Sequence, residues 1–291
     1  MSDSQSRLLP SRNYTDSFYT ASKNTSKFLS LQVGKDGMSY AILSPTDNTV
    51  ELTREFIFDS VNSNADLLAD IRGIVENDPA LMGPFFHTSI GFYQGKSTLI
   101  PEALFEAGME ESYLNFTEDS DVERYFFSNK LVNLRSRNVF SVDKALCDYL
   151  QSCYPTPLFL HSSTPLIDVF ALQEKRNSGR RCFIHVQYSH FEILCFEKGE
   201  LRFYNSFDYT TAEDLLYYVL FVFEQLDLNQ ESEPISVFGE IDQYGTIADL
   251  LKRYLGAVEF GNRIDMLSYS PALDAVPKHY YINLYQQFLC E

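Results

Sequence analysis

CFIHVQYSHFEILCFEKGELRFYNSFDY, residues 182–209, contains three consecutive segments in which apolar and polar side chains alternate. Alternation with a period of two is typical of half-buried β-strands. The three segments are CFIHVQ, FEILCFE and ELRFYNSFDY, and the turn EKGE between the last two predicts a tight hairpin around Gly199. The stretch therefore predicts a meander of three strands.

A similar stretch begins at Phe28. FLSLQV, MSYAILS and VELTREFIF predict three more strands, joined by a Gly-Lys-Asp-Gly turn and by the turn PTDNT. After each meander the apolar spacing predicts a helix, a strand and a second helix. In the first half these are residues 64–81, 87–93 and 100–116, and in the second half 211–226, 234–241 and 246–255. Residues 157–163 predict a strand that completes the first sheet, and 164–175 predict a helix that follows it.

The order of elements predicts an internal duplication. Aligning Ser30 with Phe183 keeps the first hairpins of the two halves in register without a gap. A repeat of this size indicates two similar domains, although two such units can also arise by chance. We expect a first domain at 26–164 and a second at 165–291, with a terminal helix at 279–290 that packs back on the first domain. Residues 1–25 are predicted to be a mobile tail, or an irregular segment clipped onto the body by side chains such as Tyr14 and Phe18.

The charge balance excludes several classes of partner. With 40 acidic and 23 basic residues the net charge is −17, whereas binding to nucleic acid or anionic membranes requires Lys and Arg to neutralise phosphates. The densest basic cluster, Lys175, Arg176, Arg180 and Arg181, is interrupted by residues 177–179 and indicates a solvated turn. We therefore expect neither nucleic acid nor direct membrane insertion, and a protein as the partner.

Cysteine usage and hydropathy predict a cytoplasmic protein. The five cysteines are odd in number and form no CxxC pair, so neither a zinc site nor a disulfide framework is expected. The N-terminal residues lack the apolar core of a secretion signal. The most apolar helix, DLLYYVLFVFEQL, is too short to span a bilayer about 30 Å thick.

A meander followed by helix, strand, helix and strand, with the whole repeated once, resembles the actin-like ATPase superfamily. That group includes actin, Hsp70, the sugar kinases, and the bacterial cell-division and pilus-platform relatives of actin. CFIHVQYSHFEILCFEKGELRFYNS is similar to the segment that opens the second domain of the pilus-platform relatives. Within the superfamily the chain looks like a bacterial family to which no activity is assigned. The resemblance implies an α/β fold with duplicated ribonuclease-H-like domains in an actin-like arrangement, mixed five-stranded sheets flanked by helices, and a cleft between the domains.

In this superfamily the first hairpin of each domain carries an acidic residue, one further residue and a glycine. The acid holds metal-bound water, and the glycine lets backbone amides approach phosphate. Superposing the pattern places Gln32 and Gly34 in the first hairpin and His185 and Gln187 in the second. A neutral amide and a usually neutral imidazole do not replace the missing charges, and Gln187 adds a side chain where phosphate would lie.

The third loop of the superfamily carries a Gly-Gly pair that packs against adenosine. The matching residues are Gly239 and Glu240, and a carboxylate at the second position repels phosphate. The resemblance therefore implies a chain without ATP hydrolysis, bound cofactor or metal. Gly34, Lys35 and Gly37 leave open a partial anion-binding turn in the first hairpin.

Three functions follow from these departures. The first is a catalytically silent binding or scaffold protein. The second is a nucleotide-binding protein with diverged phosphate loops, in which acids such as Asp36 or Asp242 act instead. The third is an enzyme of unrelated chemistry that uses the cleft. The sequence leaves the oligomeric state open.

Four further motifs are weaker. His185 and His190 with Glu192 have the elements of a metal site but lack a further ligand. HSSTP at 161–165 lacks the context of a serine nucleophile, and GKST at 95–98 lacks the upstream glycine of a phosphate loop. The acidic run at 118–123 indicates a solvated loop.

Overall fold

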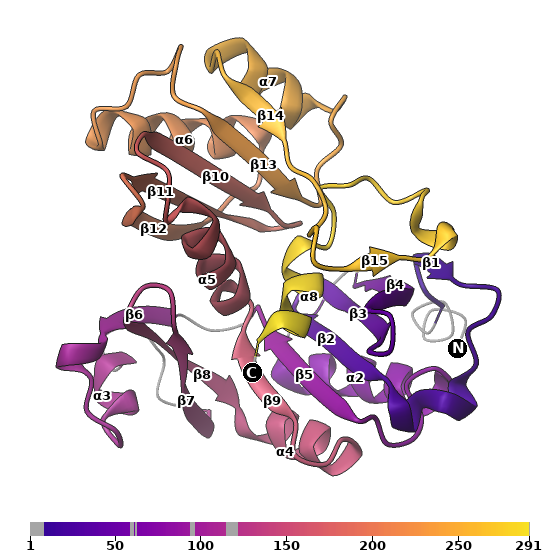
Figure 1. Ribbon diagram of the computed structural model, residues 1–291. Helices are drawn as coiled ribbons and strands as arrows, with labels where there is room; N and C mark the ends of the chain where they lie inside the picture. The colour runs from indigo at the N-terminus through magenta and orange to yellow at the C-terminus, as the bar shows by residue number, and fades with distance from the viewer. Residues whose placement is uncertain (1–8, 59–60, 62, 94–96, 115–121, 291) are drawn as a thin grey trace. The chain divides into compact units, whose positions relative to one another are not determined.

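The computed structural model describes residues 9–58, 61, 63–93, 97–114 and 122–290. The chain divides into two compact units (Figure 1). Unit 1 comprises Met1–Leu166, Asp265–Ala275 and Asn283–Glu291, and unit 2 comprises Ile167–Ile264 and Val276–Ile282. Each unit contains its own mixed sheet and is described by itself.

Unit 1 is built on a seven-stranded sheet with the order β1-β4-β3-β2-β5-β9, in which β15 also pairs with β4. The strands are β1 Arg12–Thr15, β2 Phe28–Gly34, β3 Gly37–Ser44, β4 Thr49–Ile57, β5 His87–Phe92, β9 Leu158–His161 and β15 Ser268–Tyr269. The predicted meander forms β2, β3 and β4, which pair antiparallel, while β5 and β9 add in parallel. The sheet is wider than the five strands expected, because β1 and β15 both extend it at β4.

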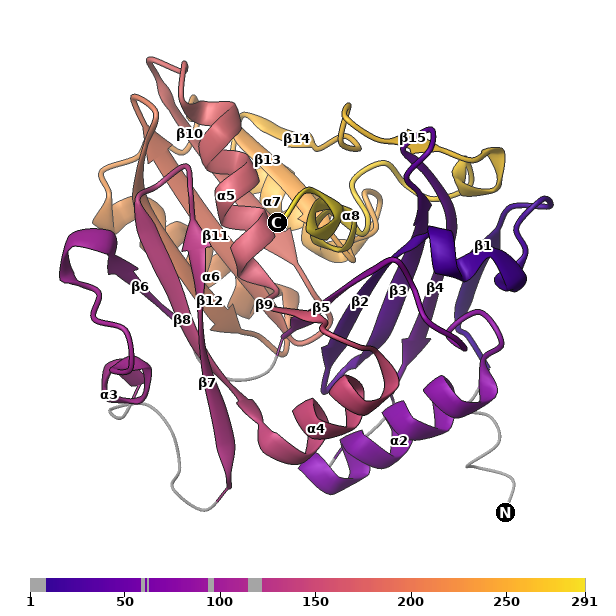
Figure 2. The ribbon, with the colours of Figure 1, turned by 60° about the horizontal axis from the view of Figure 1, so that its bottom comes forward.

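Helices cover both faces of this sheet. On one face, α2 (Asn64–Asn77) and α4 (Lys144–Cys153) lie side by side over a core of apolar side chains from β2 to β5 (Figure 2). Ser63 and Asp143 cap the two helices by accepting backbone amides. The opposite face carries α8 (Ile282–Gln286) and the 3₁₀ turn Gln287–Leu289.

The N-terminal segment is partly structured. Residues 1–8 lie outside the described residues, whereas Arg12–Thr15 pair with β4 and Ala21–Ser26 form a 3₁₀ helix. These contacts favour the alternative of a segment clipped onto the body, and the range 1–25 as a tail stays a prediction. The residues of β1, RNYT, do not alternate between apolar and polar side chains, so the sequence did not predict a strand here. β1 pairs with β4 through its backbone at the edge of the sheet. Tyr19 packs against the core of unit 1. Phe18, one of the side chains expected to clip this segment onto the body, is 90% exposed and does not anchor it.

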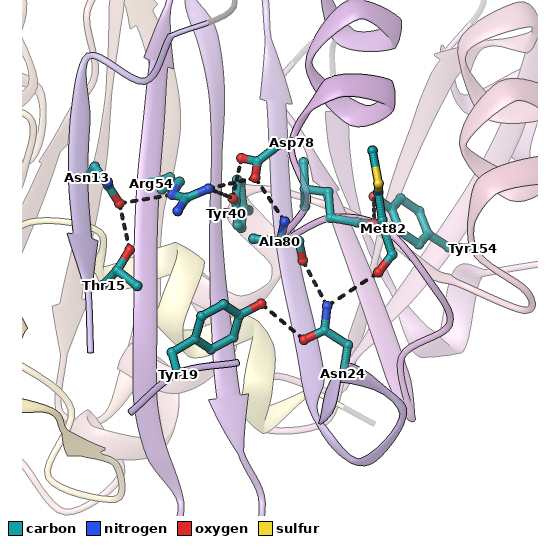
Figure 3. Close-up of polar contacts among 11 residues, drawn as sticks. Asn13, Thr15, Tyr19, Asn24, Tyr40, Arg54, Asp78, Ala80, Met82 and Tyr154 are labelled. Atoms are coloured by element: carbon teal, nitrogen blue, oxygen red, sulfur yellow. Dashed lines mark hydrogen bonds and ion pairs between the residues drawn. The ribbon is translucent and has the colours of Figure 1, made fainter. Parts of the chain in front are cut away.

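A polar cluster fastens this segment to unit 1 (Figure 3). Arg54 of β4 donates from Nε to Asn13 Oδ1 at 2.9 Å and from Nη1 to Asp78 Oδ1 at 2.6 Å. The Tyr40 hydroxyl donates to the other Asp78 oxygen at 2.5 Å, and burial raises the pKa of Tyr40, which keeps this proton in place. Asn24 donates to the carbonyl of Ala80 at 3.0 Å.

A separate three-stranded sheet, with the order β6-β8-β7, belongs to unit 1. Its strands are β6 Ser97–Pro101, β7 Arg124–Leu131 and β8 Ser136–Asp143. The predicted helix at 100–116 is wrong over its described residues, 100–114: β6 ends at Pro101, a 3₁₀ turn follows at Glu102–Leu104, and of these residues only Glu110–Leu114 form an α-helix, α3. Residues 115 and 116 lie outside the described part. Gly108 has φ +88°, a left-handed conformation that interrupts any helix through this region.

Unit 2 contains a five-stranded sheet with the order β12-β11-β10-β13-β14. Its strands are β10 Arg180–Val186, β11 His190–Glu197, β12 Glu200–Asp208, β13 Ile235–Gly239 and β14 Val258–Phe260. Helices α6 (Ala212–Gln225) and α7 (Thr246–Tyr254) cover one face, and α6 begins with a capping box between Thr211 and Asp214. On the other face, Phe170 of α5 (Ser163–Glu174) stacks on Phe183 at 4.2 Å between centroids.

The two sheets share one topology. The order β4-β3-β2-β5-β9 in unit 1 matches β12-β11-β10-β13-β14 in unit 2, with the same sequence of antiparallel and parallel neighbours. The predicted α/β architecture of mixed sheets flanked by helices is confirmed. The domain ranges 26–164 and 165–291 stay a prediction, and the compact units differ from them because residues after Ile264 alternate between units.

Candidate functional site

The first of the three loops lies in unit 1, where β2 turns into β3. Gly34 pairs with Gly37 across the turn, and Lys35 and Asp36 form its tip. Gln32 lies on β2, two residues before the turn, and its side chain is buried. Its Oε1 accepts a hydrogen bond from the Tyr93 hydroxyl at 2.6 Å. The position where the superfamily carries an acid is therefore an amide engaged within the same unit.

The C-terminal segment covers this part of the sheet. Asn283 Nδ2 donates to the Tyr93 hydroxyl at 2.6 Å, which extends the chain of hydrogen bonds from Gln32. Beside Gln32, a Cβ atom on Gly91 would lie 2.5 Å from the side-chain amide of Gln287. Gly91 is therefore required for the close approach of Gln287 to β5.

The second loop lies in unit 2, where β10 turns into β11. His185 Nδ1 lies 3.1 Å from Glu192 Oε2, and His185 Nε2 lies 3.1 Å from Gln187 Nε2. Tyr204 donates from its hydroxyl to Glu192 Oε1 at 2.8 Å. The four side chains form one chain of hydrogen bonds around the buried His185 and Glu192, and the carboxylate of Glu192 is an acceptor in it.

This arrangement defines the protonation of the pair. Burial raises the pKa of Glu192, but the hydrogen bond from His185 and further favourable contacts, including the one from Tyr204, outweigh burial and hold that pKa below its ordinary value. Because the amide nitrogen of Gln187 can only donate and the carboxylate of Glu192 accepts, the contacts fit Nε2 of His185 as acceptor and Nδ1 as donor. At the position where the superposition predicts the superfamily's acid, His185 presents a donor already committed to a carboxylate.

The third loop adjoins the second within unit 2. Gly239 has φ +94°, and a Cβ atom there would lie 2.0 Å from the carbonyl oxygen of Val186. Only glycine fits this position. The structure therefore brings His185, Gln187, Gly239 and Glu240 together at the carboxyl ends of β10 and β13, as the superposition predicts for one domain.

The backbone amides of these loops bond within unit 2. Gln187 donates to the carbonyl of His190 at 2.9 Å, Gly239 to that of His279 at 2.9 Å, and Glu240 to that of Val186 at 2.8 Å. Amides of this kind are the groups that hold phosphate in nucleotide sites. At these three residues they are directed to carbonyl oxygens of the protein.

The other predicted motifs contribute no site. His161 Nδ1 lies 2.7 Å from Ser163 Oγ, which also accepts from Asn138 at 2.9 Å, so this buried serine organises the start of α5. Gly95 and Lys96 of the GKST motif, and residues 118–121 of the acidic run, lie outside the described residues. In the basic cluster, Arg180 pairs with Glu197 and Arg181 with Glu259.

Within the described part of the chain, no group of three or more His, Cys, Asp or Glu side chains is placed to hold a metal ion. The helices of that same part are all too short or too polar for a membrane span.

Sequence reasoning missed the partners of the loop residues. Glu192 faces His185 across the β10–β11 hairpin, a register that the hairpin itself implies. Asn283 and Gln287 come from the far end of the sequence and gave no local signal.

The profile of the family described as "Protein of unknown function (DUF3822)" matches residues 16–258. No curated protein matches the sequence.

Solved structures show the fold. A protein of Bacteroides thetaiotaomicron, with an actin-like ATPase fold and unknown function, is 24% identical, with 94% of this chain and 100% of that chain covered and a TM-score of 0.78. The PilM-PilN type IV pilus biogenesis complex contains a chain that is 10% identical, with 91% of this chain and 98% of that chain covered and a TM-score of 0.62. The predicted actin-like fold is thus confirmed.

Proposed function

The chain belongs to the DUF3822 family of proteins of unknown function, and from this membership and its actin-like fold we propose that it is a non-catalytic actin-like protein that binds another protein as a scaffold module. In this proposal the two units are ribonuclease-H-like domains that arose by duplication. The shared strand order of their sheets supports that origin.

The observation that carries the proposal is that Gln32 and His185, at the two hairpin positions, are both engaged in hydrogen bonds within the protein. Gln32 is neutral and hydrogen-bonded to Tyr93, and His185 is hydrogen-bonded to Glu192 and Gln187. Seating a magnesium–phosphate group needs carboxylates free to orient metal-bound water. Releasing His185 for such a role would leave the buried charge of Glu192 without its partner, which is costly.

The remaining loop features support the same proposal. The amides of Gln187, Gly239 and Glu240 already bond to carbonyl oxygens, and Glu240 adds a carboxylate that repels phosphate. At the first hairpin, Gln287 occupies the space beside Gly91. A nucleotide would have to displace these groups before making contacts of its own.

A protein partner is supported by fold and by charge. A similar fold occurs in the PilM-PilN complex, where two proteins assemble. The net charge of −17 opposes nucleic acids and favours a partner with basic surface. The described cysteines form no disulfide with one another, which is compatible with the reducing cytoplasm, where we place the protein.

The second candidate is a nucleotide-binding protein with diverged loops. It is favoured by the glycines that remain at Gly34 and Gly239, both next to the places where phosphate lies in the superfamily. In this candidate, acids such as Asp36 or Asp242 would replace the missing hairpin carboxylates. Asp242 Oδ1 accepts a hydrogen bond from the backbone amide of Tyr244 at 2.9 Å and is therefore engaged in its own turn.

Thermal unfolding with and without Mg-ATP separates the two candidates. A non-catalytic scaffold keeps the same melting temperature at millimolar Mg-ATP. Under the alternative, ligand at 100 times its Kd stabilises the fold by about 2.7 kcal/mol and raises the melting temperature by several degrees. A shift that Mg-ADP also produces and that Glu240→Gly enlarges would overturn the silent-scaffold proposal.

The scaffold role itself is tested with a partner isolated from native extract and then purified. We expect a complex of defined stoichiometry to re-form from the two pure proteins without nucleotide. Failure to re-form from pure components, or a strict requirement for Mg-ATP, contradicts the proposal.

A further inference from the structure

The two matching sheets differ at one edge. In unit 1 the outer edge of β4 is occupied, since Arg12–Thr15 of β1 pair with it antiparallel and Ser268–Tyr269 of β15 pair in parallel. Its counterpart in unit 2 is β12, at the end of the sheet (Figure 1). Among the described residues, β11 is the only strand that pairs with β12. In the part of the chain that the structure describes, no strand pairs with the second edge of this nine-residue strand.

Exposed side chains and the backbone amide of Ser206 indicate which backbone groups of β12 point away from β11. Arg202 is 62% exposed at its side chain, and Asn205, Ser206 and Asp208 are also exposed. The amide of Ser206 donates to the side-chain oxygen of Asn205 at 2.9 Å, so it does not point towards β11. Because backbone direction alternates along a strand, the amides and carbonyls of Tyr204 and Asp208 point outward as well. Such a row of groups is a template for another strand.

An aromatic surface on α6 continues from this edge. Phe207 of β12 stacks on Tyr218 at 4.8 Å between centroids, and Tyr217 contacts Tyr218 at 5.3 Å. Tyr217 is 63% exposed and stacks on Phe221, which is 44% exposed. Exposed aromatic side chains next to an open strand are typical of protein interfaces.

We propose that a second copy of this chain binds here, with β12 of each copy pairing antiparallel about a two-fold axis at Asn205. The ladder shifts between Cys195 and Phe196 of β11, so the regular part of β12 starts at Phe203. With the axis at Asn205, the segment 203–207 pairs with itself in regular register, and Arg202 and Asp208 lie at its two ends. The inference goes beyond the proposed function and does not depend on it.

Charge and shape select this register. Arg202 donates from Nε to Glu197 Oε2 at 3.0 Å within its own copy. It also lies opposite Asp208 of the other copy, which gives two cross-strand pairs of opposite charge. Phe203 lies opposite Phe207 in non-hydrogen-bonded pairs, where facing side chains are closest. An axis at Tyr204 would instead place Glu200 opposite Asp208, two like charges on facing positions. The result is a closed, isologous dimer with a continuous ten-stranded sheet, two copies of the five-stranded one.

Single cysteines test the register. Cα atoms in a non-hydrogen-bonded antiparallel pair are about 4.5 Å apart, within disulfide reach, so Asn205→Cys should cross-link to itself across the axis. Ser206→Cys is the matched control: it faces Tyr204 of the other copy, and the two new thiols lie beyond the roughly 7 Å limit. Both are made with the half-buried thiols removed by Cys153→Ser and Cys290→Ser.

Sedimentation equilibrium tests whether the cross-strand pairs of Arg202 and Asp208 stabilise the dimer. Arg202→Asp or Asp208→Arg alone should weaken dimerisation about tenfold, because two attractive pairs become repulsive, and the double variant should restore it. Ser206→Pro removes an outward amide without breaking the ladder to β11, so a folded monomer is expected. The proposal is overturned by a wild-type monomer without selective cross-linking of Asn205→Cys, by equal cross-linking of Ser206→Cys, or by a dimer insensitive to all of these changes.

Discussion

At the scale of the residue, the loop positions are held by short, specific contacts within their own unit. His185 and Glu192 are both buried and bonded to each other, and Gly239 lies against a backbone carbonyl. Buried pairs of this kind cost much to break from one side, because the remaining charge is left without a partner. The stability of unit 2 should therefore respond to single changes here.

The pH dependence of stability should change in Glu192→Gln. The folded-state pKa of Glu192 is depressed, so its contribution is present above the unfolded value near 4.5 and is lost as pH falls through the folded pKa. The free energy of unfolding of the wild type should exceed that of Glu192→Gln at pH 7, and the gap should narrow below about pH 4.5. Urea unfolding at several pH values measures this. Glu224→Gln, at an exposed position on α6, is the control and should show no such gap.

Gly239→Ala should be more destabilising than Gly108→Ala. Both positions have positive φ, which costs an L-residue about 1–2 kcal/mol. At Gly108 nothing lies within 4 Å of an added Cβ, whereas at Gly239 the carbonyl oxygen of Val186 lies 2.0 Å away. Chemical denaturation should show a loss of about 1–2 kcal/mol for Gly108→Ala and a larger loss for Gly239→Ala. Equal losses would contradict the packing described at Val186.

At the scale of the element, the meanders were predictable and the added strands were not. β2–β4 and β10–β12 carry apolar side chains at alternate positions that enter a core, and in β2, β10 and β11 most of the residues between them are buried as well. β1 is a short polar strand held by its backbone and by Arg54, and β7 (RYFFSNKL) gave no alternation, since most of its side chains are only half buried. The loop positions could be found from hairpin patterns, but Tyr93, Asn283 and Gln287 come from elements distant in sequence.

Arg54→Ala should release β1. The change removes the bonds to Asn13 and Asp78 and leaves the buried Asp78 carboxylate without its cation, at a cost of about 2–3 kcal/mol. Amide hydrogen exchange at Arg12–Thr15 should accelerate relative to β3. Arg72→Ala is the control, because the exposed Arg72–Glu76 pair contributes little. Unchanged exchange in Arg54→Ala would show that backbone pairing alone holds β1.

At the scale of the whole molecule, charge is the property that the sequence determines most directly. The net charge of −17 should keep the protein from duplex DNA and from vesicles rich in anionic lipid. In gel-shift and vesicle-flotation experiments at 0.15 M salt we expect no binding at micromolar protein. Saturable binding in either experiment would require a local basic surface, and the paired state of Arg180 and Arg181 argues against one at that cluster.

The membership of Asn283–Glu291 in unit 1 has a consequence during synthesis. The hydroxyl of Ser30 bonds to the carbonyl of Leu284, and Thr53 to the hydroxyl of Tyr285, so the sheet translated first is completed by residues translated after all of unit 2. Until those residues leave the ribosome, the nascent N-terminal half lacks part of its cover. Ribosome-stalled chains ending before Asn283 should therefore be cut by protease within unit 1 more readily than full-length released protein.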